Sequence, residues 1–180
     1  MHGVIIAILL TVQTAPAPDG ARGRGACQLL TAEEIHAVQG VALKERKPSG
    51  EKGRDLTFEQ CFFASADFAH SVSLTVITGN APTRAAARAF WQKTFDEPRE
   101  TGRVQQALKD ERERENAARR IAGLGEQAFW TGDTRTGALY VRSGSAVLRI
   151  SVGGVADQNE RLRRSTALAT LALKRLQEAR

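Results

Sequence analysis

The stretch GALYVRSGSAVLRISVGG, residues 137–154, decides the fold because apolar and polar side chains alternate along it on both sides of a short turn. One face of the alternation holds Leu139, Val141, Leu148, Ile150 and Val152. The other face holds Tyr140, Arg142, Arg149 and Ser151. Since side chains along a strand point alternately to the two faces, and Ser143-Gly144 suits a tight turn, the stretch predicts a half-buried antiparallel hairpin.

The polar face of this hairpin has three readings, and the sequence does not choose among them. It is solvated, it is covered by the mixed-charge insertion described below, or it is a binding surface.

The composition fits one ordinary soluble domain. The chain has 180 residues, of which 42% are hydrophobic and 26% are charged, and these are values of a globular protein with a real core. The net charge of +6 permits attraction to phosphates, anionic lipids or acidic partners. No aromatic residues are interleaved with the arginines near the C-terminus to stack bases, so we expect no nucleic-acid binding.

The N-terminus has the features of an export signal. A short apolar run, Val4 to Val12, precedes a segment rich in proline, alanine, glycine and arginine. The run is too short for a transmembrane helix, which needs about 20 apolar residues. We therefore expect residues 1–26 to be a signal-like segment and linker, residues 27–180 to form one domain, and the protein to be periplasmic or extracellular. The alternative is a disordered tail on a cytosolic protein.

The chain has two cysteines, Cys27 and Cys61, and nothing resembling a set of four metal ligands. We expect one disulfide between them and no metal site. Such a bond persists outside the reducing cytosol, so the cysteines also favour export.

Further elements follow from local signals. CQLLTAEEIHAVQG, residues 27–40, predicts a short helix with a capping box of Thr31 and Glu34, ended by Gly40. Residues 44–55 predict an exposed loop, whereas residues 56–65, 70–79 and 121–130 predict strands. Residues 80–97 and 157–179 predict helices.

The segment 98–120 is a charged insertion, which we interpret as a solvated helix or a mobile segment and alternatively as a partner-binding arm. The fold expected from all of these elements is α+β. It is a mostly antiparallel sheet of about five strands, packed by a short N-terminal helix, a middle helix and a long C-terminal helix.

Several segments together resemble one known group of proteins. They are a cysteine before a capped LLT helix, a second cysteine in the first strand, GLGEQAFW, LYVRSGSAVLRISVGG and ALATLALKRL. This pattern resembles small exported and lipid-anchored bacterial proteins of unknown function whose relatives adopt a PsbP-like α/β sandwich. The resemblance implies that fold, an envelope location and a binding role, and it brings no catalytic residues.

The sequence contains no motif for a catalytic centre. HExxH, GxSxG, a phosphate-binding loop and paired CxxC motifs are all missing, so we expect neither catalysis nor a cofactor. His70 near Asp67 suggests either a dyad or a surface histidine in a structural hydrogen bond.

We expect a non-catalytic envelope module that binds an unknown protein or a small hydrophobic or anionic ligand. Aromatic and arginine side chains commonly anchor partners. The candidate binding residues are Phe129, Trp130, Tyr140, Arg142 and Arg149. The alternative for Phe129 and Trp130 is that they fill the core.

Two rival functions remain open. One is a cell-envelope enzyme with a dispersed acid/base site. The other is peripheral binding to anionic membranes through the arginine-rimmed C-terminal helix.

Overall fold

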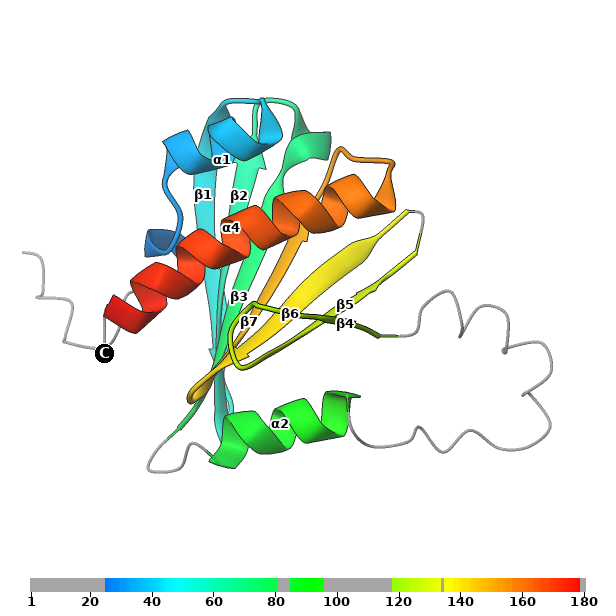
Figure 1. Cartoon of the computed structure of the whole chain (residues 1–180). Helices are drawn as coiled ribbons and strands as arrows, with labels where there is room; N and C mark the ends of the chain where they lie inside the picture. Colours follow the sequence, from blue (N-terminus) through cyan, green and yellow to red (C-terminus); the bar gives the residue numbers. More distant parts are fainter. Residues whose placement is uncertain (1–24, 81–84, 96–117, 134, 179–180) are drawn as a thin grey trace, which may run out of the picture.

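A computed structural model describes residues 25–80, 85–95, 118–133 and 135–178. The described residues form one seven-stranded sheet with helices on both faces (Figure 1). The strands are β1 (Leu43–Lys52), β2 (Leu56–Ser65), β3 (Val72–Gly79), β4 (Arg119–Ile121), β5 (Gln127–Gly132), β6 (Gly137–Ser143) and β7 (Ala146–Val152). The helices are α1 (Ala32–Gln39), α2 (Ala85–Phe95) and α4 (Gln158–Glu178), with short 3-10 turns η1 (Ala26–Gln28) and η2 (Phe68–His70).

The strand order is β1-β2-β3-β7-β6-β5-β4, and all neighbours are antiparallel. The α+β class therefore holds, but the expected number of about five strands is wrong. The two additional strands, β1 and β4, lie at the two edges of the sheet.

Strand β1 corrects the prediction of an exposed loop at residues 44–55. Nearly all of its side chains are exposed, so it has no buried face and no apolar alternation. Its backbone pairs with β2 from Leu43 to Lys52. Pro48 and the surrounding charges are typical of an edge strand, where they discourage pairing with other chains.

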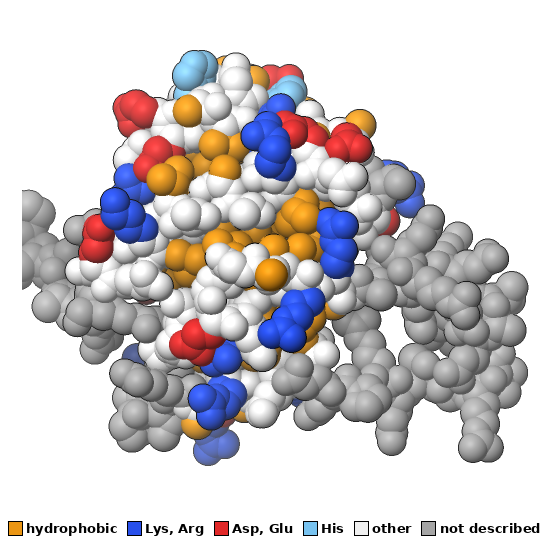
Figure 2. All heavy atoms as spheres, in the orientation of Figure 1, with side chains coloured by type: hydrophobic (Ala, Val, Ile, Leu, Met, Phe, Trp, Pro, Cys, Tyr) orange, Lys and Arg blue, Asp and Glu red, His pale blue; other side chains and the backbone are white. Residues whose placement is uncertain are grey.

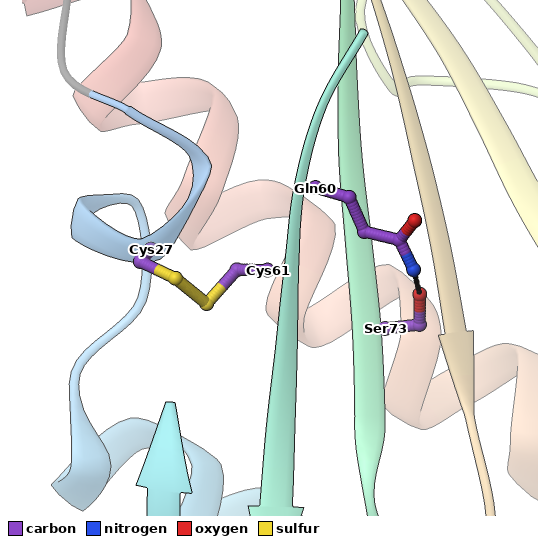
Figure 3. The surroundings of a disulfide bond; sticks show 4 residues. All are labelled: Cys27, Gln60, Cys61 and Ser73. Carbon is purple, nitrogen blue, oxygen red and sulfur yellow. Dashed lines mark hydrogen bonds between the residues drawn. A yellow bond between two sulfur atoms is a disulfide. The ribbon is translucent and has the colours of Figure 1, made fainter. Parts of the chain in front are cut away.

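The two faces of the sheet carry different packing because successive side chains point in opposite directions. Figure 3 shows this at β2, where Cys61 points to Cys27 of η1 and Gln60 points away toward Ser73 of β3. Helices α1 and α4 pack on the first face, which carries the main core. Helix α2 packs on the second, which we call the α2 face.

The main core is built from the apolar alternation of the central strands. Its fully buried large side chains include Phe63, Leu74, Trp130, Leu139, Leu148, Ile150 and Leu168. The hairpin prediction is confirmed by the register Leu139↔Ile150 and Val141↔Leu148. Gly144 follows β6 with a φ of 59°, the left-handed region that glycine adopts without strain.

The N-terminal helix and its tether are also confirmed. Thr31 Oγ1 accepts a 3.2 Å hydrogen bond from the Glu34 backbone N–H, and Glu34 Oε2 accepts one of 2.8 Å from the Thr31 N–H. Gly40 ends the helix at a φ of 75°. A disulfide joins Cys27 to Cys61 with their Cα atoms 4.9 Å apart.

Two predicted segments fall mainly outside the described residues. Of the signal-like segment and linker, residues 1–26, the described part begins at residue 25. Of the charged insertion, residues 98–120, the described part begins at residue 118 and includes the start of β4. Both assignments, and the division into leader and domain, stay predictions.

No helix in the described ranges combines the length and the apolar character that crossing a membrane requires.

Candidate functional site

The structure brings four of the five predicted binding residues together and separates the fifth. Trp130 points into the main core and is 1% exposed, so for this residue the core-filling alternative is right. Phe129, Tyr140, Arg142 and Arg149 belong to the α2 face, because Phe129 pairs with Tyr140 and Tyr140 pairs with Arg149 in the strand register.

An aromatic cluster docks α2 onto this face. Phe95 stacks on Phe129 with ring centroids 4.9 Å apart, and it meets the edge of Tyr140 at 5.2 Å. Trp91 lies 5.6 Å from Phe129. Around them pack Leu56, Phe58, Ile77, Ala87, Phe90 and Val147. Phe129 thus holds a helix in place, which makes it a structural residue of the α2 face.

Arg149 and Tyr140 form a second contact on the same face. The Arg149 Nε–H donates a 3.1 Å hydrogen bond to the Tyr140 hydroxyl, and its guanidinium carbon lies 5.7 Å from the centre of the Tyr140 ring. Thr75 is directly opposite Arg149 in the strand register. Ser73 and Ser151 form the next pair along, so this part of the α2 face is polar and half-buried.

A cavity of about 220 Å³ opens between α2 and the strands β5 and β6. Its lining residues are Arg88, Trp91, Gln92, Gln127 and Arg142. We call it the α2 cavity. Four of its five lining residues have polar or charged side chains, and the fifth, Trp91, also belongs to the aromatic cluster beside it.

Arg142 is held in one orientation at the wall of the α2 cavity. Its Nε–H donates to Gln127 Oε1 at 3.2 Å, and its Nη1 pairs with Glu126 Oε2 at 2.5 Å. Glu126 is itself anchored, since its Oε1 accepts a 2.7 Å hydrogen bond from the Gly144 N–H. The Arg142 side chain is only 13% exposed. Packing and hydrogen bonds therefore fix this charge before any ligand arrives.

Sequence reasoning missed Arg88, Trp91, Gln92 and Gln127. Arg88 and Gln92 are four residues apart on an exposed side of α2, and residues at that spacing are neighbours on a helix surface. Gln127 is opposite Arg142 in the β5–β6 register. The helical pattern was readable, but the meeting of α2 with β5 depends on tertiary packing.

Comparison with known proteins gives no family. No family model matches the chain, and no curated protein matches it. The extracellular domain of PknH from Mycobacterium tuberculosis aligns over 86% of this chain and 100% of its own, with 13% sequence identity and a TM-score of 0.46. A likeness of this degree carries no argument about function. The PsbP-like sandwich implied by the sequence pattern stays a prediction.

The contact between Asp67 and His70 is part of a turn. Asp67 Oδ2 lies 2.9 Å from His70 Nδ1, while Asp67 Oδ1 accepts a 3.1 Å hydrogen bond from the Ala69 N–H in η2. The two nearby serine hydroxyls donate to backbone carbonyls, Ser65 to His70 and Ser71 to Phe68. The hydrogen bonds of Asp67 and His70 therefore stabilise the connection between β2 and β3.

The arginines of α4 are engaged in ion pairs. Arg163 and Arg164 both form ion pairs with Glu160. The hydrogen bond from Arg163 has the largest effect, and together with that from Arg164 it lowers the pKa of Glu160 to about 2. Arg175 binds Glu34 of α1. On the face seen in Figure 2, acidic and basic side chains are interspersed. The positive charge of α4 is thus partly neutralised within the fold.

The described part of the chain has no group of three or more histidine, cysteine, aspartate or glutamate side chains arranged to hold a metal ion.

Proposed function

We propose that the chain is an exported, non-catalytic domain that binds its ligand or partner on the α2 face of the sheet. The observation that carries this proposal is the α2 cavity beside the aromatic cluster. Ligand sites are typically concave, with aromatic surface and a few convergent polar groups. The pre-oriented Arg142 and the neighbouring Arg88 supply such groups at one place.

Export is supported by the disulfide between Cys27 and Cys61. Disulfides persist in oxidising compartments and are rare in the cytosol. The apolar run at the start of the chain points the same way. We therefore propose that the domain works in the periplasm or outside the cell.

We propose that the domain is not catalytic because its potentially reactive side chains are engaged in structural hydrogen bonds. Hydrogen bonds hold four such side chains in the connection between β2 and β3, namely Ser65, Asp67, His70 and Ser71. A nucleophile needs a hydrogen-bonded base whose proton-accepting atom faces it. In this turn the serine hydroxyls donate to backbone carbonyls instead.

The experiment is shift mapping by amide NMR. The oxidised, isotope-labelled protein is titrated with a filtered small-molecule extract of the cell envelope and, separately, with solubilised envelope proteins. We expect the shifted amides to belong to α2, β5, β6 and β7. Shifts confined to α1, α4 or β1 would contradict the proposed site.

The same extract also tests the absence of catalysis. After incubation with the protein, its composition measured by mass spectrometry should be unchanged. Steady consumption of one component, abolished by boiling the protein, would show an enzyme.

A further inference from the structure

We infer that the α2 cavity binds the oxyanion group, a carboxylate or a phosphate, of a small ligand. This inference rests on the proposed binding function and names the ligand class of the same site. Arginine guanidinium groups match both carboxylates and phosphates because they present several N–H donors in a planar fork.

The charge at the cavity favours an anion. Arg88 and Arg142 bring two positive charges to its lining, and the two glutamines that complete the polar lining are neutral. Glu126 offsets one of these charges through its pair with Arg142. Arg88 has no ion pair within the described residues. Within the described residues, a guanidinium without an ion pair thus lines the same cavity as one that is already oriented.

The side chain of Trp91 gives a second reason through its position at the cavity, since the indole N–H of Trp130 in the main core equally lacks an acceptor among the described residues. Trp91 lines the cavity, it is 1% exposed, and its indole N–H has no hydrogen-bond acceptor among the described residues. A buried donor without a partner is unfavourable by the cost of its lost hydration. An oxyanion in the cavity would bring acceptor atoms to the lining that Trp91 shares with the two arginines.

The size of the cavity limits what enters. At about 220 Å³ it lies below the range of roughly 300–1,000 Å³ that is usual for drug-sized ligands. The cavity therefore suits a small anion or the charged end of a larger ligand. The aromatic cluster around Phe95 and Phe129 lies beside the cavity, and Trp91 belongs to both.

The two tryptophans of the chain provide an internal control for the test. Trp91 lines the cavity, whereas Trp130 lies in the main core on the opposite face of the sheet. Each gives one indole N–H signal in the NMR spectrum, and the variant Trp91→Phe assigns them. The oxidised full-length protein is titrated with inorganic phosphate, with succinate, and with chloride at matched ionic strength.

We expect phosphate, succinate or both to shift the Trp91 signal while the Trp130 signal stays in place. A response to phosphate alone indicates a phosphate ester as the ligand, and a response to succinate alone indicates a carboxylic acid. Arg88→Gln should weaken the binding about tenfold or more, because it removes a charged donor. Arg88→Lys should restore part of it. Arg163→Gln, on α4, should change nothing.

Three results would overturn the inference. They are no shift of the Trp91 signal with either oxyanion, an equal shift with chloride, and an unchanged affinity in Arg88→Gln. Arg88 is exposed on α2, so we expect the variants at this position to fold. If the oxyanions fail while the envelope extract still shifts amides of the α2 face, the binding function stands and only the ligand class falls.

Discussion

Glu34 of α1 and Arg175 of α4 are joined by two charge-assisted hydrogen bonds of 2.7 Å each, although 141 residues separate them in the chain. Arg175 also donates to the Leu29 carbonyl at 2.9 Å. The side chains are 19% and 24% exposed. This pair fastens the N-terminal helix, and with it the segment that carries the disulfide, to the C-terminal helix.

Arg175→Gln should lower the free energy of unfolding by about 1 kcal/mol, because a paired, partly buried guanidinium is lost. Urea unfolding measures the change. Arg163→Gln is the matched control, since its pair with Glu160 lies on the exposed side of the same helix, and it should cost less. Equal losses in the two variants would mean that the link between α1 and α4 contributes no more to stability than the exposed pair does.

The same pair predicts a dependence on pH. The hydrogen bonds from Arg175, more than any other contact, hold the pKa of Glu34 below its ordinary value. Because the pKa is lower in the folded than in the unfolded chain, the contribution is complete above the unfolded pKa of about 4.3 and is lost as pH falls through the folded pKa. The difference in unfolding free energy between wild type and Arg175→Gln should therefore shrink below about pH 4. A difference that is constant down to strongly acidic pH would rule this out.

Two glycines between β4 and β5 allow the cost of backbone strain to be measured separately from the cost of steric overlap. Gly123 and Gly125 have φ values of 77° and 58°. A Cβ at Gly123 meets nothing within 4 Å, whereas one at Gly125 would lie 2.6 Å from Val141 Cγ1 and 2.7 Å from the Arg142 carbonyl. Gly123→Ala should cost about 1–2 kcal/mol of strain, and Gly125→Ala about 2 kcal/mol more. Similar melting temperatures for the two variants would contradict this packing.

Phe95 anchors α2, so its truncation should release that helix selectively. Phe95→Ala removes contacts to Trp91, Phe129 and Tyr140 and should lower stability by about 2 kcal/mol, somewhat below the cost for a fully buried ring. Hydrogen exchange should become faster in α2 but not in α4. Phe68→Ala is the control, because this side chain is 73% exposed. Unchanged exchange in α2 of the Phe95 variant would show that the aromatic cluster does not hold it.

The disulfide should contribute strongly to stability. It closes a loop with a sequence separation of 34, and the chain-entropy model gives roughly 3–4 kcal/mol for a loop of this size. The double variant Cys27→Ser, Cys61→Ser should therefore unfold at lower urea than the oxidised wild type. It should also be insensitive to reductant, whereas the wild type should lose stability on reduction. Equal stability of the reduced and oxidised wild type would contradict the prediction.

Local signals in the sequence were sufficient for much of the fold. The capping box at Thr31 and Glu34 depends on residues three apart, and the hairpin at 137–154 depends on alternation within one stretch. Edge strands lack such signals. The side chains of β1 lie in solvent, and β4 has only three residues, so hydrogen bonding defines both strands and no burial pattern marks them in the sequence.

The candidate site was only partly predictable, for two different reasons. Grouping Trp130 with Phe129 ignored the alternation of a strand, which puts neighbours on opposite faces, so that information was present in the sequence. Arg88 and Gln92 were invisible as site residues because their role depends on where α2 docks. That docking is set by ring contacts between segments distant in sequence.

The central claim, a domain that works outside the reducing cytosol with η1 tethered to β2, is tested most directly on the native protein. Cells producing it are fractionated, and the fractions are quenched with acid. The denatured protein is then alkylated before and after reduction, and its mass is measured by mass spectrometry. We predict that the protein is found in the exported fraction and that Cys27 and Cys61 are labelled only after reduction. Native protein in the cytosolic fraction with both thiols labelled before reduction would contradict the account.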